Sequence, residues 1–293
     1  MTLDTYPNLA DRVEQALGRR PTSARPLSGG STVEVLTLDL PGGERVVVKW
    51  GPGRLTIEAA MLKALADQGS LPLPNVLSAA EDLLILEFIA SDNDTKGGLA
   101  TPGPKAQIHA AELLAGLHAT PFERFGFEID TLIGKLDQPN PWADDWVDFF
   151  REHRLLYMAR ASEREGTLPA GMLARLEKLG DRLEDLITRP PHPALLHGDV
   201  WTGNLLVKGD RIAAFIDPAV YYGDREMDLA FATLFGTVGK PFFDRYQEIA
   251  PLEPGFFEIR RDLYNIYPLL VHVRYWDVSY ADGIDRTLRK LGI

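Results

Sequence analysis

The chain contains no cysteine. Disulfide bonds, a disulfide-linked dimer, thiolate nucleophiles, iron–sulfur clusters and cysteine-based zinc sites are therefore excluded. The histidines are scattered, and no pair at metal-ligand spacing has a supporting carboxylate, so we expect no zinc site. Unbroken apolar runs of membrane-spanning length are also missing, and no membrane partner is predicted.

Positive charge is scarce, because 31 basic residues face 42 acidic ones and the formal net charge is -11. Phosphate backbones repel such a chain, so nucleic acid is not an expected partner. The N-terminus lacks a basic region followed by an apolar run, so no secretory signal is predicted and the cytoplasm is the expected location. The chain of 293 residues is long enough for a large core or for two lobes that share a cleft.

Two common nucleotide-binding strings are absent. The sequence contains neither a Walker A string, GxxxxGK followed by Ser or Thr, nor a GxGxxG dinucleotide fingerprint. These absences count against P-loop and Rossmann folds.

Periodicity in the first ninety residues predicts a small antiparallel sheet with one inserted helix. A Pro-Gly-Gly turn at 41–44 joins two β-rich segments into a hairpin, and the second of these carries Lys49. The expected strands are 32–40, 45–50, 76–80 and 83–89, and the expected helices are 8–17 and 55–67.

A polar, Gly-rich segment at 91–98 is the best candidate for a linker, and the chain after it is mostly helical. The sequence therefore predicts an α+β fold with two lobes, a small sheet-containing N-lobe over 1–90 and a larger, mainly helical C-lobe over 91–293. In the C-lobe we expect helices over 105–118, 142–165, 170–187, 226–235 and 256–280 with a short last helix, and β segments at 195–197, 205–207 and 212–216.

The string from His197 to Asn204 contains the most informative side chains. Asp199 and Asn204 are five residues apart on one predicted loop, and Asp217 follows the apolar strand 212–216. Phosphoryl transfer needs a base for the attacking hydroxyl and oxygen ligands for Mg²⁺. Asp199 is the candidate base, and Asn204 and Asp217 are the candidate metal ligands. An acidic turn that only caps a hairpin is the alternative. The set as a whole favours the catalytic loop of a protein-kinase-like fold.

Upstream, Lys49 and Glu58 lie on successive predicted elements, a strand and the following helix. A Lys held by a Glu and reaching the ATP phosphates is the expected kinase arrangement. A surface ion pair is the alternative.

Other candidate residues for ATP carry weaker signals. Gly29, Gly30 and Ser31 lie between two strand candidates, where backbone N–H groups can approach phosphates, although such glycines also make ordinary turns. The backbone of Glu87 and Ile89 precedes the linker and is placed for an adenine edge, unless this segment is an edge strand.

Two residues are expected to support the loop. His197 is expected to orient the catalytic loop rather than to titrate. Asp228 is expected either to brace that loop through its backbone or simply to favour a helix start through the helix dipole.

The strings 197–204, with Trp201 inside, and 216–230 resemble the fructosamine kinase (ketosamine-3-kinase) family, which is related to aminoglycoside phosphotransferases. Val200 and Thr202 replace the commoner Leu and Ser. The upstream matches lie in the order that the family shows: 27–31, Lys49, Glu58, 86–89 and 146–150.

The resemblance implies a kinase that uses ATP and Mg²⁺ to phosphorylate a sugar hydroxyl of ketosamines such as fructosamine or ribulosamine adducts, a deglycation activity. Trp201 is then a candidate to stack on the sugar and Glu226 to attract the amine, although both have packing or solvent-facing alternatives. An aminoglycoside- or choline-type acceptor on the same fold remains the competing interpretation, and a nucleotide-binding pseudokinase is a third.

Overall fold

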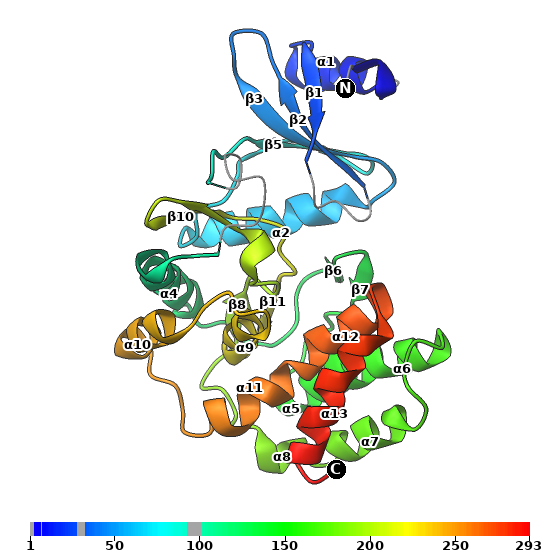
Figure 1. Cartoon of the computed structure of the whole chain (residues 1–293), viewed down its shortest axis with the longest axis vertical. Coiled ribbons are helices and arrows are strands. Elements are labelled where there is room, and N and C mark those ends of the chain that lie inside the picture. The colour runs from blue at the N-terminus through cyan, green and yellow to red at the C-terminus, as the bar shows by residue number, and fades with distance from the viewer. Residues whose placement is uncertain (1–2, 7, 28–32, 93–100) are drawn as a thin grey trace.

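The structure, a computed structural model, describes residues 3–6, 8–27, 33–92 and 101–293. A β-sheet lobe that contains the N-terminus lies above a larger helical lobe that contains the C-terminus (Figure 1). The predicted two-lobed α+β fold is confirmed. Among the described residues, no helix combines the length and the apolar character needed to cross a bilayer.

The N-lobe sheet has five antiparallel strands in the order β1-β2-β3-β5-β4. Their bounds are β1 Ser23–Pro26, β2 Glu34–Asp39, β3 Arg45–Trp50, β4 Val76–Ala80 and β5 Leu83–Glu87. Both β3 and β5 are interior strands, so the segment before the linker is not an edge strand as one of our alternatives had it. The interior position of β3 fixes where Lys49 lies.

Side chains alternate between the two faces of this sheet, and a helix covers each face. Helix α1 (Leu9–Leu17) packs on the face that carries Leu36 and Val48. Helix α2 (Leu55–Gln68) packs on the opposite face, against Leu84 and Leu86. A short 3-10 turn, η1 (Leu3–Thr5), precedes α1.

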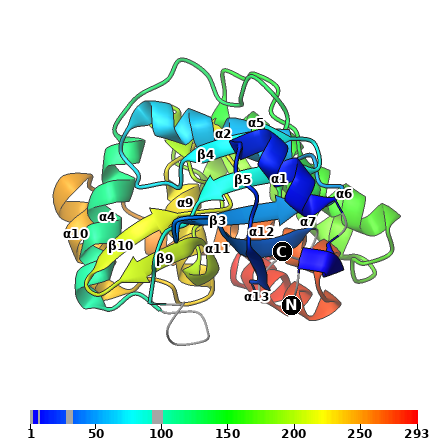
Figure 2. The same ribbon diagram turned by 90° about the horizontal axis from the view of Figure 1, so that it is seen from above.

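The C-lobe is built mainly of helices, and α4 and α10 lie side by side at one edge (Figures 1 and 2). Its helices are α4 (Pro104–His118), α5 (Trp146–Phe150), η2 (Arg151–Leu155), α6 (Leu156–Arg164), α7 (Met172–Gly180), α8 (Leu183–Leu186), η3 (Thr202–Asn204), α9 (Glu226–Leu234), α10 (Lys240–Ile249), η4 (Phe256–Arg260), α11 (Arg261–Tyr264), α12 (Ile266–Tyr275), η5 (Val278–Tyr280) and α13 (Ala281–Lys290).

Three two-stranded antiparallel sheets interrupt these helices. They pair β6 (Thr131–Ile133) with β7 (Leu136–Gln138), β8 (Ala194–Leu196) with β11 (Tyr221–Gly223), and β9 (Leu205–Lys208) with β10 (Arg211–Phe215). The β9–β10 hairpin is the one that the sequence predicts. Hairpin β6–β7 was not predicted, because strands of three residues are too short to show alternation.

Several predicted helices have different bounds in the structure. The helix expected from 142 begins at Trp146, because the Asp145 carboxylate caps it by accepting from the N–H of Asp148 at 3.0 Å. The segment 170–187 divides into α7 and α8, and 256–280 divides into η4, α11, α12 and η5. Helix α10 was missed altogether.

Candidate active site

Strand β3 and helix α2 bring Lys49 and Glu58 together. The Nζ of Lys49 lies 2.6 Å from Oε1 of Glu58, in an ion pair that is not aligned as a hydrogen bond. Both side chains are nearly buried. Burial alone would lower the pKa of Lys49, but the charges of Asp217 and Glu58 outweigh it and raise that pKa. Lys49 is therefore held as a cation inside the lobe.

The same ammonium reaches the C-lobe. Nζ of Lys49 donates to Oδ1 of Asp217 at 2.7 Å, across 168 positions of sequence. Asp217 lies two residues after β10 and has a positive φ of 52°, a conformation that aspartate tolerates better than most residues. Its side chain is 45% exposed, so the carboxylate is open to a ligand as well as bound to Lys49.

The catalytic loop carries Asp199 and Asn204 beside this carboxylate. Nδ2 of Asn204 donates to Oδ2 of Asp199 at 2.8 Å and lies 3.4 Å from the carbonyl oxygen of Asp217. The backbone N–H of Ile216 donates to the carbonyl of Asn204, which joins the loop to the end of β10. The sequence-predicted residues Lys49, Glu58, Asp199, Asn204 and Asp217 thus form one continuous series of contacts.

Burial raises the pKa of Asp199 to about 8. The hydrogen bond from Asn204 opposes this shift, and the negative charges of Asp217 and Asp228 add to it. A carboxyl group with a pKa near neutrality is suited to exchange a proton with a substrate hydroxyl.

Asp228 and His197 hold the loop in place. The Asp228 carboxylate accepts from the backbone N–H of His197 at 2.8 Å and of Gly198 at 2.7 Å. The imidazole of His197 bonds to the carbonyl of Ile216 through Nε2, at 3.1 Å. Burial lowers the pKa of His197. Asp228 thus binds the backbone of the loop, and His197 joins the loop to the residue after β10.

The sequence did not indicate that a second histidine contacts Asp228. Nε2 of His118 on α4 lies 3.2 Å from Oδ2 of Asp228, and its Nδ1 lies 2.9 Å from the hydroxyl of Tyr246 on α10. All three side chains are buried. No local motif marks His118, because its partners lie more than a hundred positions away in sequence.

Glu226 does not face the site as expected. Its side chain is only 7% exposed, and both carboxylate oxygens accept from Arg260, at 2.6 and 2.7 Å. The carboxylate is thus neutralised inside the C-lobe, which argues against a contact with the substrate amine. Trp201 is half-buried, and its ring lies against Phe235 at 6.1 Å between centroids.

The remaining residues expected to contact ATP are only partly described by the structure. Gly29, Gly30 and Ser31 lie outside the described residues. Glu87 ends β5, and its carboxylate accepts from the side chain of Asn75 at 2.6 Å. No backbone hydrogen bond of Ile89 is present among the described residues.

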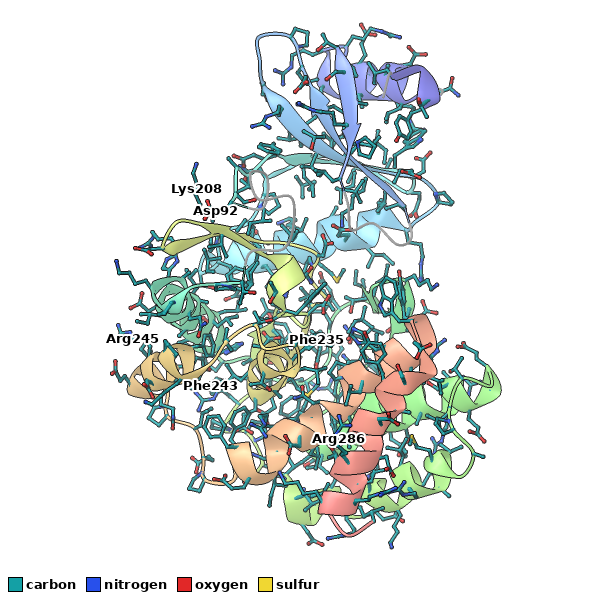
Figure 3. All side chains as sticks on the ribbon, in the orientation of Figure 1. Asp92, Lys208, Phe235, Phe243, Arg245 and Arg286 are labelled. Atoms are coloured by element: carbon teal, nitrogen blue, oxygen red, sulfur yellow. The ribbon has the colours of Figure 1, made fainter. Side chains whose placement is uncertain are left out.

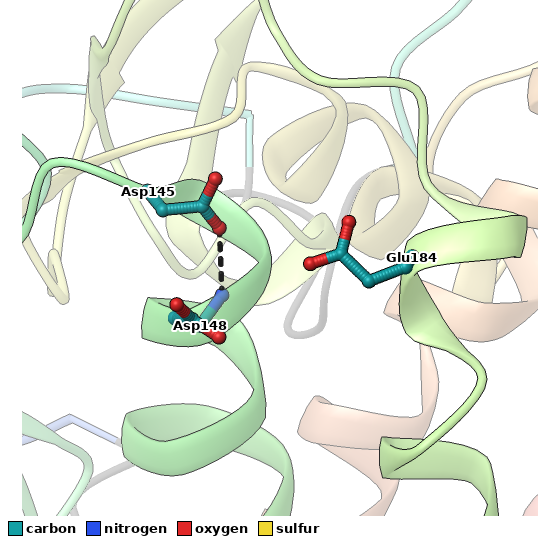
Figure 4. Close-up of side chains that lie close together, drawn as sticks. All are labelled: Asp145, Asp148 and Glu184. Carbon is teal, nitrogen blue, oxygen red and sulfur yellow. Dashed lines mark hydrogen bonds between the residues drawn. The ribbon is translucent and has the colours of Figure 1, made fainter.

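A second acidic group has no part in this series of contacts. Asp145, Asp148 and Glu184 converge at the start of α5 and on α8 (Figure 4). Arg189 already binds Asp145 at 2.9 Å and Glu184 at 2.8 Å. Because cations of the protein already neutralise this group, we interpret it as a surface ion-pair cluster.

The sequence comparisons decide the family. The model of the family described as fructosamine kinase matches residues 6–292. The chain belongs to the fructosamine kinase family. Members are phosphotransferases, so the chain is a kinase. A Synechocystis protein named "Probable ketoamine kinase" is 33% identical over 97% of this chain and 96% of its own length. An Arabidopsis thaliana protein-ribulosamine 3-kinase is 31% identical over 82% of this chain and 74% of its own.

Solved structures agree with this assignment of the fructosamine kinase family. A candidate fructosamine-3-kinase from Thermobifida fusca has a TM-score of 0.84 and 31% identity, covering 96% of this chain and 97% of its own. The streptomycin–ATP–APH(2")-IIa complex has a TM-score of 0.60 at 18% identity, covering 97% and 96%. The latter likeness shows a shared fold.

Proposed function

We propose that this protein transfers the γ-phosphoryl group of ATP to a sugar hydroxyl of a ketosamine, such as a fructosamine or ribulosamine adduct. The observation that carries the proposal is the continuous series Glu58–Lys49–Asp217–Asn204–Asp199, which joins the two lobes. The names of the relatives supply the acceptor class. In this proposal the N-lobe is 1–90 and the C-lobe is 91–293.

Each side chain of the series has a role in the proposal. Lys49, held by Glu58, binds the α- and β-phosphates, and the backbone of Glu87 and Ile89 binds the adenine. Asp199 accepts the proton of the attacking hydroxyl while that oxygen bonds to the γ-phosphorus and the bond to ADP breaks. The residues Gly29, Gly30 and Ser31 are proposed to cover the phosphates.

Asn204 and Asp217 are suited to hold Mg²⁺. The donor set consists of an amide and a carboxylate oxygen, which this hard cation prefers. The Asp217 carboxylate is partly exposed, and Nδ2 of Asn204 is turned toward Asp199, which leaves its amide oxygen for another partner. The ion would neutralise the phosphate charge when bound.

A panel of acceptors tests the proposal. ADP release is measured with fructosyl and ribulosyl amines, and in parallel with aminoglycosides and choline. We expect saturable turnover with the ketosamines. Turnover only with the other acceptors would favour the competing acceptor class, and nucleotide binding without any turnover would favour a pseudokinase.

A further inference from the structure

A cluster of aromatic side chains lies beside the catalytic loop and has no part in the nucleotide half of the site. We call it the aromatic wall, and it consists of Trp201, Phe235, His272 and Tyr280. Ring centroids are 6.1 Å apart for Trp201 and Phe235, 5.0 Å for Phe235 and His272, and 4.8 Å for His272 and Tyr280. Four separate segments of the C-lobe thus converge on one ring surface.

The aromatic wall is partly open to solvent. Phe235 is 38% exposed, and Trp201, His272 and Tyr280 are partly exposed. Most other aromatic side chains of the C-lobe are buried in its core. Aromatic side chains that lie together and are partly exposed are typical of a binding surface.

Hydrogen bonds fix this wall relative to Asp199. The backbone N–H of Thr202 donates to Oγ1 of Thr237 at 2.7 Å, and the two hydroxyls lie 3.0 Å apart. Thr202 is three residues after Asp199, Thr237 is two residues after Phe235, and both threonines are buried. The ring of Phe235 is therefore held at a set distance from the proposed base, between α9 and α12 in the view of Figure 3.

Two carboxylates on the elements that carry the aromatic wall are already bonded within the protein. Arg260 occupies both oxygens of Glu226. Asp277 accepts from the backbone N–H of Ser279 at 2.8 Å, at the start of η5. An ammonium group at this surface would meet aromatic faces, which attract cations through their quadrupole.

His272 adds a polar atom to the same surface. Its Nδ1 lies 2.7 Å from the carbonyl of Pro268 and must donate to it, so Nε2 is the acceptor nitrogen of the neutral ring. Burial lowers the pKa of His272, which keeps the ring neutral near pH 7. A neutral ring does not repel a cation.

We propose that the aromatic wall binds the protonated amine of the acceptor, with its first carbon substituents, through the faces of Phe235, Tyr280 and Trp201. The sugar then lies between the wall and Asp199. This inference rests on the proposed ketosamine kinase function and deepens it, because it assigns the charged half of the acceptor to rings at the end of α9, on η5 and on the catalytic loop.

Kinetics with two matched acceptors tests the inference. One is a fructosyl amine whose secondary amine is protonated, and the other is its N-acetyl derivative, which keeps the sugar but carries no charge. For Phe235→Leu we expect KM for the charged acceptor to rise about tenfold, with kcat and the KM for ATP unchanged. KM for the neutral acceptor should change by less than about twofold. Phe235→Tyr keeps the ring face and should retain the wild-type KM.

The chain offers a matched control. Phe257 on η4 is 36% exposed and packs against Phe243 and Phe256, so Phe257→Leu makes the same change at a similar exposure away from the wall. An equal rise in KM for both acceptors in Phe235→Leu would overturn the inference, since the ring would then act through shape alone. Unchanged KM values would overturn it too.

Failure of the proposed function has a different signature. If the wild-type protein turns over neither acceptor, the ketosamine assignment falls and the inference falls with it. If the wild-type protein turns over the charged acceptor but Phe235→Leu behaves like Phe257→Leu, only the inference falls.

Discussion

Lys49 lies 2.6 Å from Glu58 and 2.7 Å from Asp217, so one cation faces carboxylates from two lobes. Without this cation, the two carboxylates would repel each other and the phosphates of a nucleotide. Asp199, which accepts from Asn204, is the carboxyl group of this site that Lys49 does not contact. At the residue scale, the site separates a charge-neutralising half from a proton-accepting half.

Replacing the proposed base should stop the chemistry and spare the fold. For Asp199→Asn we expect kcat to fall by about a hundred- to ten-thousandfold, because an amide cannot accept the proton. Steady-state ADP release measures the change, and thermal unfolding checks the fold. Asp210→Asn, an exposed aspartate in the β9–β10 turn, is the control. Wild-type turnover in Asp199→Asn would remove this residue from the mechanism.

Removing the proposed metal ligand should change the response to Mg²⁺. For Asp217→Ala we expect turnover to fall by about a hundredfold or more, with a rightward shift of the Mg²⁺ titration. The loss of a phosphate-facing carboxylate ligand weakens metal binding at the site. Initial rates over a range of Mg²⁺ at fixed ATP measure the effect. An unchanged Mg²⁺ midpoint would contradict the metal-binding role.

Arg260 and Glu226 should stabilise the C-lobe as a buried pair. Breaking the pair in Arg260→Met leaves a buried carboxylate without its partner, so we expect a loss of about 3–5 kcal/mol in the free energy of unfolding. Urea unfolding measures it. The double variant with Glu226→Gln should lose less than the single variant, because no charge is left buried. A loss below 1 kcal/mol in Arg260→Met would contradict the prediction.

At the scale of elements, the catalytic loop is held by tight backbone approaches. The N–H groups of His197 and Gly198 bind Asp228 at the start of α9, and the N–H of Ala219 donates to the carbonyl of His197 at 2.8 Å. Gly198 has a φ of 83°, and a Cβ there would overlap the carbonyl oxygen of Ala219. The loop therefore depends on this glycine to bring β8 and the Asp217 segment together.

Gly198→Ala should disturb activity more than a comparable glycine substitution. Both strain and overlap must be relieved by moving the loop, so we expect kcat to fall by more than about tenfold. Gly209→Ala is the control, because Gly209 also has a positive φ, 60°, but open space around its Cβ position. The control should lose about 1 kcal/mol of stability and keep its turnover. Equal kcat values for the two variants would contradict the idea that activity depends on the close approach of Gly198 to Ala219.

At the scale of the whole molecule, two ion pairs between the lobes lie in different environments. The Lys49–Asp217 contact lies inside the proposed nucleotide site. The Arg54–Asp137 pair joins the start of α2 to hairpin β6–β7 at 2.5 Å, and both side chains are about half exposed. Exposed pairs contribute little to stability, whereas a ligand that contacts both lobes adds its binding energy to their association.

Nucleotide binding should therefore stabilise both lobes together. At Mg·ADP one hundred times its Kd, we expect about 2.7 kcal/mol of added stability. Lys49→Ala should lose most of this gain, because the nucleotide loses its phosphate contact. Arg54→Ala should change stability by less than about 1 kcal/mol and keep the full nucleotide response. Thermal or urea unfolding with and without nucleotide measures both. A full response in Lys49→Ala would contradict the prediction.

The sequence predicted the elements that local pattern controls. Segments rich in β-branched and apolar residues marked β2 and β3, and the turn after residue 40 marked their connection. The two motif strings located Asp199, Asn204 and Asp217 within one site, because each lies on a short loop next to a hairpin. Helix ends were less accurate, as at Asp145, because a cap depends on one side chain's hydrogen bond.

The sequence did not predict ion pairs between residues that are distant along the chain. Glu226 carries the family pattern, but its role depends on Arg260, which approaches it from another helix. His118, Tyr246 and the aromatic wall are assembled in the same way, from α4, α9, α10, α12 and η5. No local sequence pattern predicts contacts between such distant segments.

By itself, the sequence determined the type of chemistry, because spacing along one chain segment fixes which side chains share a loop. Only the tertiary structure decided which carboxylates remain open to a ligand and which are neutralised inside the protein. The reason is physical: burial and ion pairing depend on the packing of helices that are distant in sequence, and these set both the charge and the accessibility of each group.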